Sequence, residues 1–97
     1  MIGSWAVYAI RCTGEGIYVG ISQDVNRRYL QHCRGTGAVY TRLHRPIALL
    51  GSFGGLSLKA ARRTERQLKS LPRTQKLVAL HELITRRSSM RTIGNCM

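Results

Sequence analysis

The alternation of apolar and polar residues near the start of the chain predicts two short β-strands. Residues 5–11, WAVYAIR, and residues 16–21, GIYVGI, are short, apolar and rich in residues that favour strands. The CTGE segment between them contains glycine, which is typical of a turn. We therefore expect the two segments to form a β-hairpin.

The register of this hairpin decides which side chains meet. If the loop comprises residues 12–14, Tyr8 lies opposite Tyr18 on one face of the sheet. That face also carries Gly20, and the missing side chains of Gly16 and Gly20 would leave open space beside Tyr18. A shift of one residue would place the two tyrosines on opposite faces.

A helix is predicted over about residues 25–34. Ser22 or Asp24 can cap its start, and Gly35 can end it. Helical spacing places Val25, Tyr29 and Cys33 on one apolar stripe. Arg28 and His32 form a polar pair one turn apart.

The rest of the chain predicts one more strand and two more helices. A glycine-rich, basic connection over residues 35–46 comes first and is followed by a strand over residues 47–53. Ser57 can cap a helix over about residues 58–70, and a last helix begins at Pro72 and spans residues 72–84. This order predicts an α+β fold with a three-stranded, largely antiparallel sheet flanked by about three helices. We expect one domain over residues 1–84 and a basic, flexible tail over residues 85–97.

The charge of the chain indicates a polyanionic partner. The 97 residues include 16 lysines and arginines, mostly arginine, against 4 aspartates and glutamates, for a net charge of +12. A surface of one sign repels itself unless it is neutralised, and the planar guanidinium group matches phosphate oxygens in pairs. Nucleic acid is therefore the expected partner, although high charge could also serve solubility alone.

The cysteines and the apolar residues argue against several other classes of protein. Cys12, Cys33 and Cys96 show neither a CxxC motif nor cysteine–histidine ligand spacing, so we expect a reducing compartment and no zinc site. At 43% hydrophobic residues, the chain should fold without disulfides or a structural metal. No apolar run approaches the ~20 residues of a membrane span, and the N-terminal residues do not resemble a signal peptide. We expect a cytoplasmic protein with no membrane partner.

Glu65 stands out among the few carboxylates. Within the predicted helix 58–70 it lies on the same stripe as the apolar residues Leu58, Ala61, Leu68 and Leu71. A carboxylate there is costly unless it is paired or binds a cation. It can form a salt bridge with Lys69 or Arg62, or it can bind Mg²⁺, which often uses one or two protein carboxylates together with waters and phosphate oxygens. Spacing alone leaves both alternatives open.

These residues together resemble the GIY-YIG nuclease family, in particular its small single-domain branch, which is similar to the N-terminal domain of the excision-repair nuclease. The resemblance spans residues 5–80, with AVY at 6–8 as the first motif and YVG at 18–20 as the second. It depends on an ordered set of residues, Tyr8, Tyr18, Gly20, Arg28 and Glu65. Two positions depart from the family pattern, because Ala6 replaces a glycine and Ile21 replaces the lysine of the repair branch.

The resemblance implies hydrolysis of a phosphodiester bond by water, with one divalent metal, Mg²⁺ or Mn²⁺, bound by Glu65. Arg28 would donate to the phosphate oxygens, and His32 would hold phosphate or shuttle a proton. Tyr8 would be the general base, or a relay that orients the water, and its pKa would be lowered by Arg28 and the metal. Tyr18 would orient the water or the phosphate through its hydroxyl group.

The expected substrate is DNA, held mainly through its phosphates. The residues expected to contact it are Gly20, which leaves room for the substrate backbone, and a group of side chains, Arg27, Tyr40, Arg42, Arg62, Lys69 and Arg73. Phosphate contacts do not read sequence, so we expect weak sequence specificity, a preference for single-stranded or structured DNA, and no extensive base stacking. The alternatives are a non-catalytic nucleic-acid-binding module with the same fold and a ribosome-associated basic protein.

Overall fold

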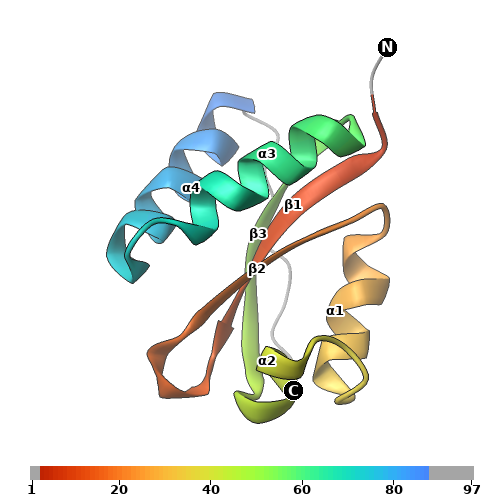
Figure 1. Ribbon diagram of the computed structural model, residues 1–97, viewed down its shortest axis with the longest axis vertical. Helices are drawn as coiled ribbons and strands as arrows, with labels where there is room; N and C mark the ends of the chain where they lie inside the picture. Colours follow the sequence, from red (N-terminus) through yellow and green to blue (C-terminus); the bar gives the residue numbers. More distant parts are fainter. Residues whose placement is uncertain (1–2, 88–97) are drawn as a thin grey trace.

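Three antiparallel strands form the sheet, namely β1 (Trp5–Cys12), β2 (Ile17–Ser22) and β3 (Pro46–Leu56). In the computed structural model, which describes residues 3–87, β1 lies between the other two strands (Figure 1). The predicted α+β class with a three-stranded antiparallel sheet is confirmed. β3 continues beyond its predicted end at residue 53, because Leu56 still pairs with Trp5.

The predicted register of the hairpin is wrong by two residues. Tyr8 pairs with Gly20, and Tyr18 pairs with Ile10. The loop is Thr13–Glu15, one residue later than predicted, because Gly14 and Glu15 adopt left-handed backbone conformations with φ of 76° and 62°. Since the shift is an even number of residues, the two tyrosines still lie on the same face of the sheet.

Four helices accompany the sheet: α1 (Val25–Cys33), α2 (Val39–Leu43), α3 (Leu58–Lys69) and α4 (Arg73–Arg87). The predicted caps are correct, because the side chain of Asp24 accepts a hydrogen bond from the Arg27 N–H and that of Ser57 accepts one from the Ala60 N–H. α2 replaces part of a segment predicted to be an irregular connection. It is too short for its apolar residues to show a helical period.

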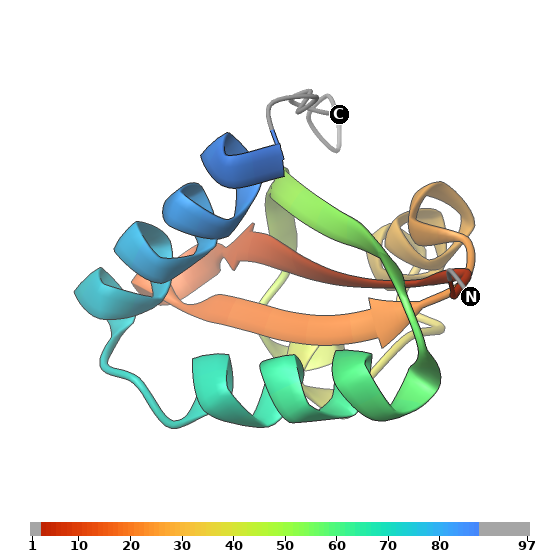
Figure 2. The ribbon, with the colours of Figure 1, turned by 90° about the horizontal axis from the view of Figure 1, so that it is seen from above.

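The helices cover the two faces of the sheet in pairs, with α3 and α4 on one face and α1 and α2 on the other (Figure 1). Because strand side chains alternate, Val7 and Ala9 pack in one core with α3 and α4, whereas Tyr8 and Ile10 pack in a second core with Tyr29 of α1. Figure 2 shows α3 alongside the edge strand β2. Side chains of α3 can therefore reach around this edge toward the face that carries the tyrosines.

The C-terminal boundary predicted at residue 84 stays a prediction. α4 runs to Arg87, and residues 88–97 of the predicted tail lie outside the described residues. None of the helices within residues 3–87 is long and apolar enough to cross a membrane.

Candidate active site

A buried chain of hydrogen bonds connects β1, α1 and α2. The Tyr8 hydroxyl lies 2.8 Å from His32 Nε2, and His32 Nδ1 lies 2.7 Å from Thr41 Oγ1. The single hydroxyl proton of Thr41 is donated to the Ala38 carbonyl at 2.9 Å. Thr41 therefore accepts from Nδ1–H, which leaves Nε2 as the acceptor for the Tyr8 proton. The Ala38 N–H, at 3.5 Å from Nδ1, is too distant to compete strongly.

His32 is held in its neutral form. Its side chain is completely buried, and this burial, followed by the positive charge of Arg28, lowers the pKa of His32 to about 4. A buried ring presents no nitrogen to a phosphate in solvent. Of the two roles predicted for His32, the geometry therefore favours proton transfer with Tyr8.

The lowered pKa of His32 makes stability depend on pH. The unfolded chain binds a proton at His32 near pH 6.5, whereas the folded chain binds it only near pH 4. The contribution of His32 to the free energy of unfolding should therefore be complete above pH 6.5, and the free energy of unfolding should decline by about 3 kcal/mol as the pH falls to 4. Urea unfolding at several pH values measures this slope. His32→Gln should reduce it, and an equal slope in both proteins would contradict the prediction.

Tyr8 is a buried phenol, with 1% of its surface exposed. Burial, followed by the neighbouring Tyr18, raises its pKa, and Glu65 adds to this effect. Arg28 lowers the pKa, as predicted, but burial outweighs it, so the expectation of a net decrease is wrong for the protein alone. Tyr8 therefore stays protonated and can act as a base only by passing its own proton on.

The spaces beside Tyr18 are filled, contrary to the expectation that they would be open. A Cβ atom on Gly20 would lie 2.7 Å from the Tyr8 hydroxyl and 3.0 Å from Tyr18 Cε2. The Tyr40 hydroxyl occupies the place where a Gly16 side chain would be. The two glycines thus make room for the hydroxyl groups of Tyr8 and Tyr40, and Gly20 is itself buried.

Gly20→Ala should therefore displace Tyr8. We expect activity to fall about tenfold, because small displacements of a reacting group are costly, and stability to fall by ~1–3 kcal/mol through overpacking. Gly54→Ala is a matched control on β3, since its Cβ would meet only the Ala6 Cβ at 3.5 Å. Melting temperatures and cleavage rates of both variants test this. Similar behaviour of the two variants would contradict it.

Glu65 and Lys69 extend from α3 to the same region. Glu65 Oε2 lies 3.1 Å from Lys69 Nζ, and this amine lies 5.7 Å from the centre of the Tyr18 ring. The salt bridge considered for Glu65 is thus present. The carboxylate is half-buried and close enough to Tyr8 to raise the pKa of the phenol.

The protein groups fit a metal ion that has a single protein ligand. Within residues 3–87, no three histidine, cysteine, aspartate or glutamate side chains cluster to form a metal site. One carboxylate suits Mg²⁺ or Mn²⁺ when waters and phosphate oxygens provide the remaining ligands. Glu65 is the residue that could hold such an ion.

An aromatic row leads from the buried histidine to the surface. The centre of the Tyr18 ring lies 5.0 Å from that of His32 and 6.0 Å from that of Tyr40, which in turn lies 4.6 Å from that of His44. His44 is thus connected to the site, a role that the sequence did not indicate. Thr41 also belongs to the site, but a threonine in a segment without a helical period gives no signal of this role.

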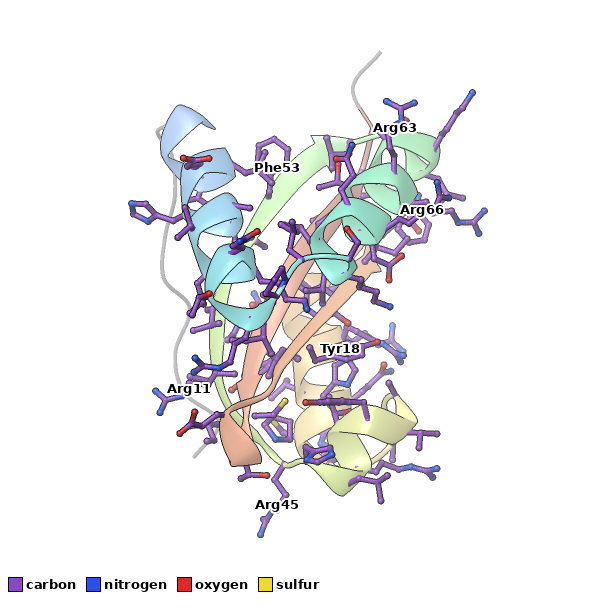
Figure 3. All side chains as sticks on the ribbon, turned by 60° about the vertical axis from the view of Figure 1, so that its left-hand side comes forward. Arg11, Tyr18, Arg45, Phe53, Arg63 and Arg66 are labelled. Atoms are coloured by element: carbon purple, nitrogen blue, oxygen red, sulfur yellow. The ribbon has the colours of Figure 1, made fainter. Side chains whose placement is uncertain are left out.

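The predicted substrate-binding residues are spread more widely. The side chains of Arg27, Arg42 and Arg62 are exposed. Arg73 contacts the hairpin loop, where its Nε donates to the Glu15 carbonyl. In Figure 3, Tyr18 lies between the arginines of α3 and Arg45, so cations are present on both sides of the site.

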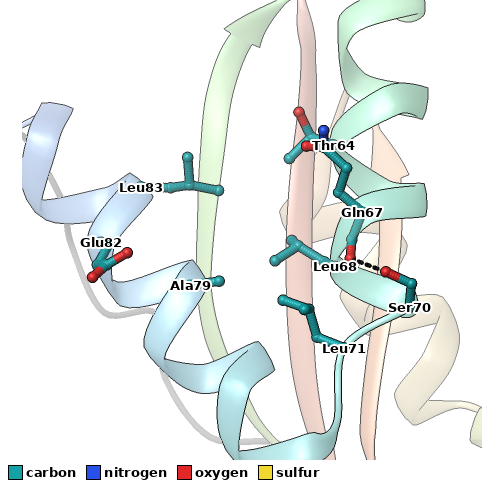
Figure 4. A pocket seen from close by; sticks show the side chains of 8 residues that line it. All are labelled: Thr64, Gln67, Leu68, Ser70, Leu71, Ala79, Glu82 and Leu83. Atoms are coloured by element: carbon teal, nitrogen blue, oxygen red, sulfur yellow. Dashed lines mark hydrogen bonds between the residues drawn. The ribbon is translucent and has the colours of Figure 1, made fainter.

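A separate hollow lies between α3 and α4, with a volume of about 430 Å³ (Figure 4). Its apolar lining residues are Leu68, Leu71, Ala79 and Leu83. Since α3 and α4 cover the face opposite Tyr8, this hollow is not part of the candidate active site.

Comparison with known proteins agrees with the motifs. The GIY-YIG catalytic domain family matches residues 4–77 of the chain. A UPF0213 protein of Cupriavidus necator is 42% identical over 73 residues, which are 75% of this chain and 79% of the relative. A UPF0213 protein of Xanthomonas axonopodis pv. citri is 42% identical over 76 residues, which are 78% of this chain and 74% of the relative. One of Staphylococcus epidermidis is 34% identical over 76 residues, which are 78% of this chain and 93% of the relative. No solved structure matches significantly. With Tyr8, Arg28 and Glu65 all inside the matched span, the chain belongs to the GIY-YIG family.

Proposed function

We propose that the protein is a divalent-metal-dependent DNA nuclease that hydrolyses phosphodiester bonds by water attack. The observation that supports this proposal best is the convergence of groups from separate elements around Tyr18. Tyr8 is hydrogen-bonded to His32, Arg28 and Glu65 both influence the pKa of Tyr8, and Lys69 lies over the ring of Tyr18. The GIY-YIG domain itself suggests a nuclease.

The hydrogen-bond directions suggest how the water is activated. The attacking water gives its proton to the Tyr8 oxygen while Tyr8 passes its own proton to His32 Nε2, so no free phenolate is needed. Thr41 keeps His32 in the tautomer that can accept. A bound phosphate diester offsets the charge of Arg28, which is one of the two causes that lower the pKa of His32.

The remaining groups act on the phosphate. Arg28 donates to the non-bridging oxygens as negative charge develops. The side-chain amide of Gln31 orients the Arg28 guanidinium group, because Gln31 Oε1 accepts a hydrogen bond from Arg28 Nη1 at 2.9 Å. A divalent ion at Glu65 would polarise the scissile phosphate and stabilise the leaving oxygen. Tyr18 orients the water or the phosphate through its hydroxyl group.

The net charge of +12 supports DNA as the substrate, with contacts to phosphates rather than to defined base pairs. We therefore propose weak sequence specificity. We also propose a preference for single-stranded or structured DNA and action in the cytoplasm. The Lys69–Glu65 ion pair also suits a binding module without catalysis, which remains the second candidate.

The test is a cleavage assay on labelled single-stranded, duplex and branched DNA with Mg²⁺, with Mn²⁺ and with a chelator. We expect cleavage with either metal, none with the chelator, and the fastest cleavage on unpaired or branched strands. DNA that is bound tightly but remains intact under all conditions would favour the binding module.

Arg28→Ala should lower kcat by about 100-fold and affect DNA binding much less. The physical reason is that a preorganised donor contributes most when negative charge develops in the transition state. Arg27→Ala is the comparison variant: Arg27 is an exposed neighbour on α1 and an expected phosphate contact, so its loss should weaken DNA binding and leave kcat nearly unchanged. Single-turnover rates and binding isotherms separate the two effects. An equal loss of kcat and of affinity in Arg28→Ala would reduce Arg28 to a phosphate contact.

A further inference from the structure

A second hollow adjoins the candidate active site at Arg28. It has a volume of about 330 Å³ and is formed by the start of β1, the end of β2 and the start of α1. Its lining includes Trp5, Gln23, Arg27, Arg28 and Gln31. Because Arg28 also acts on Tyr8, a nucleotide whose phosphate lies against Arg28 has this hollow within its reach.

Trp5 gives the hollow an aromatic surface. The side chain is half-buried, packs on one side against the core beneath α3 and α4, and also lines the hollow. It is the single tryptophan of the chain. An aromatic ring at the wall of a polar hollow, which is lined by Asp24 as well as by Arg27 and Arg28, can stack on a nucleobase, since every base has a flat face.

Two glutamines supply the polar groups that a base edge requires. Gln31 Oε1 is used by Arg28, so its amide group can still donate outward. Gln23 Nε2 donates to Ser4 Oγ at 2.7 Å, so its carbonyl oxygen can still accept. One donor and one acceptor beside an aromatic ring match the mixed edge of a nucleobase.

We propose that this hollow binds one unpaired nucleobase of the strand, adjacent to the phosphate that Arg28 contacts. The proposal rests on the proposed nuclease function and specifies its substrate as a strand with an unpaired base at that position. A base within a duplex has its faces and its pairing edge occupied, so it must leave the helix to enter. Because amide groups can both donate and accept, the hollow accommodates different bases, consistent with weak sequence specificity.

Trp5 provides a direct readout, because it is the single tryptophan of the chain and its side chain lines this hollow. The full chain is titrated, without divalent metal, with a short single strand of thymidylate and with an abasic strand of the same length. We expect saturable quenching by thymidylate and roughly tenfold weaker apparent affinity, with little quenching, for the abasic strand. Equal quenching by the two strands, or none by thymidylate, would overturn the proposal. This measurement does not depend on cleavage, so it can succeed even where the nuclease proposal fails.

A second experiment uses Trp5→Ala and the conservative variant Trp5→Phe, with melting temperatures as a check on folding. Trp5→Ala should lower kcat/KM on single-stranded DNA roughly tenfold, and Trp5→Phe should restore most of the activity. On a strand with an abasic nucleotide beside the cleaved bond, Trp5→Ala and the wild-type protein should cleave equally. A tenfold loss that persists on the abasic strand would mean that Trp5 acts only through the fold.

Discussion

Glu65→Gln is expected to reduce DNA cleavage in Mg²⁺ by about three orders of magnitude. Within residues 3–87 no three histidine, cysteine, aspartate or glutamate side chains cluster to form a metal site, so no such cluster could take over the role of Glu65. A glutamine keeps the size of the side chain but loses the charge that binds a cation, and a metal ion contributes several kcal/mol to phosphoryl transfer. The measurement is the single-turnover rate at saturating protein.

The same substitution should leave DNA binding intact or make it tighter. Loss of the Glu65 carboxylate releases Lys69 from its ion pair, which adds a free cation next to Tyr18. Glu15→Gln is the matched control, because Glu15 is exposed in the hairpin loop. If Glu65→Gln cleaves DNA as fast as Glu15→Gln, Glu65 only forms a salt bridge and the metal assignment is wrong.

Tyr8→Phe should lower kcat by about 1,000-fold, within the range of a lost general base. The variant removes the oxygen that takes the proton from water and the donor to His32 Nε2. Binding of DNA should change little, because in the proposed mechanism Tyr8 acts on the attacking water and not on the phosphate. Stability should fall by ~1–3 kcal/mol, since His32 Nε2 is left buried without a hydrogen bond.

Tyr29→Phe is the appropriate control for this variant. Tyr29 is also buried, with 5% of its surface exposed, and it packs on the same face of the sheet without belonging to the hydrogen-bond chain. Its variant should retain cleavage within about twofold, since the substitution leaves Tyr8 and His32 unchanged. Near wild-type turnover in Tyr8→Phe would exclude Tyr8 as the base and leave the water to another group.

The sequence by itself determined the three strands, three of the four helices and the family. Strand alternation placed Tyr8 and Tyr18 on one face, and this conclusion survived a wrong register because the error was an even number of residues. The caps at Asp24 and Ser57 determined where α1 and α3 begin, since a side chain and a nearby N–H suffice to form them. The motif spacing also identified Arg28 and Glu65 as the groups to examine.

Only the tertiary structure decided how these groups act together. The loop register depended on two residues with positive φ, and α2 depended on packing against α1 rather than on a period of its own. The pKa of Tyr8 is raised and that of His32 is lowered because both are enclosed, and enclosure is contributed by residues distant in the sequence. Thr41, which selects the tautomer of His32, lies nine residues further along the chain. Local sequence determines which donors, acceptors and titratable groups are available. Their burial and the direction of their hydrogen bonds depend on how the helices pack against the sheet.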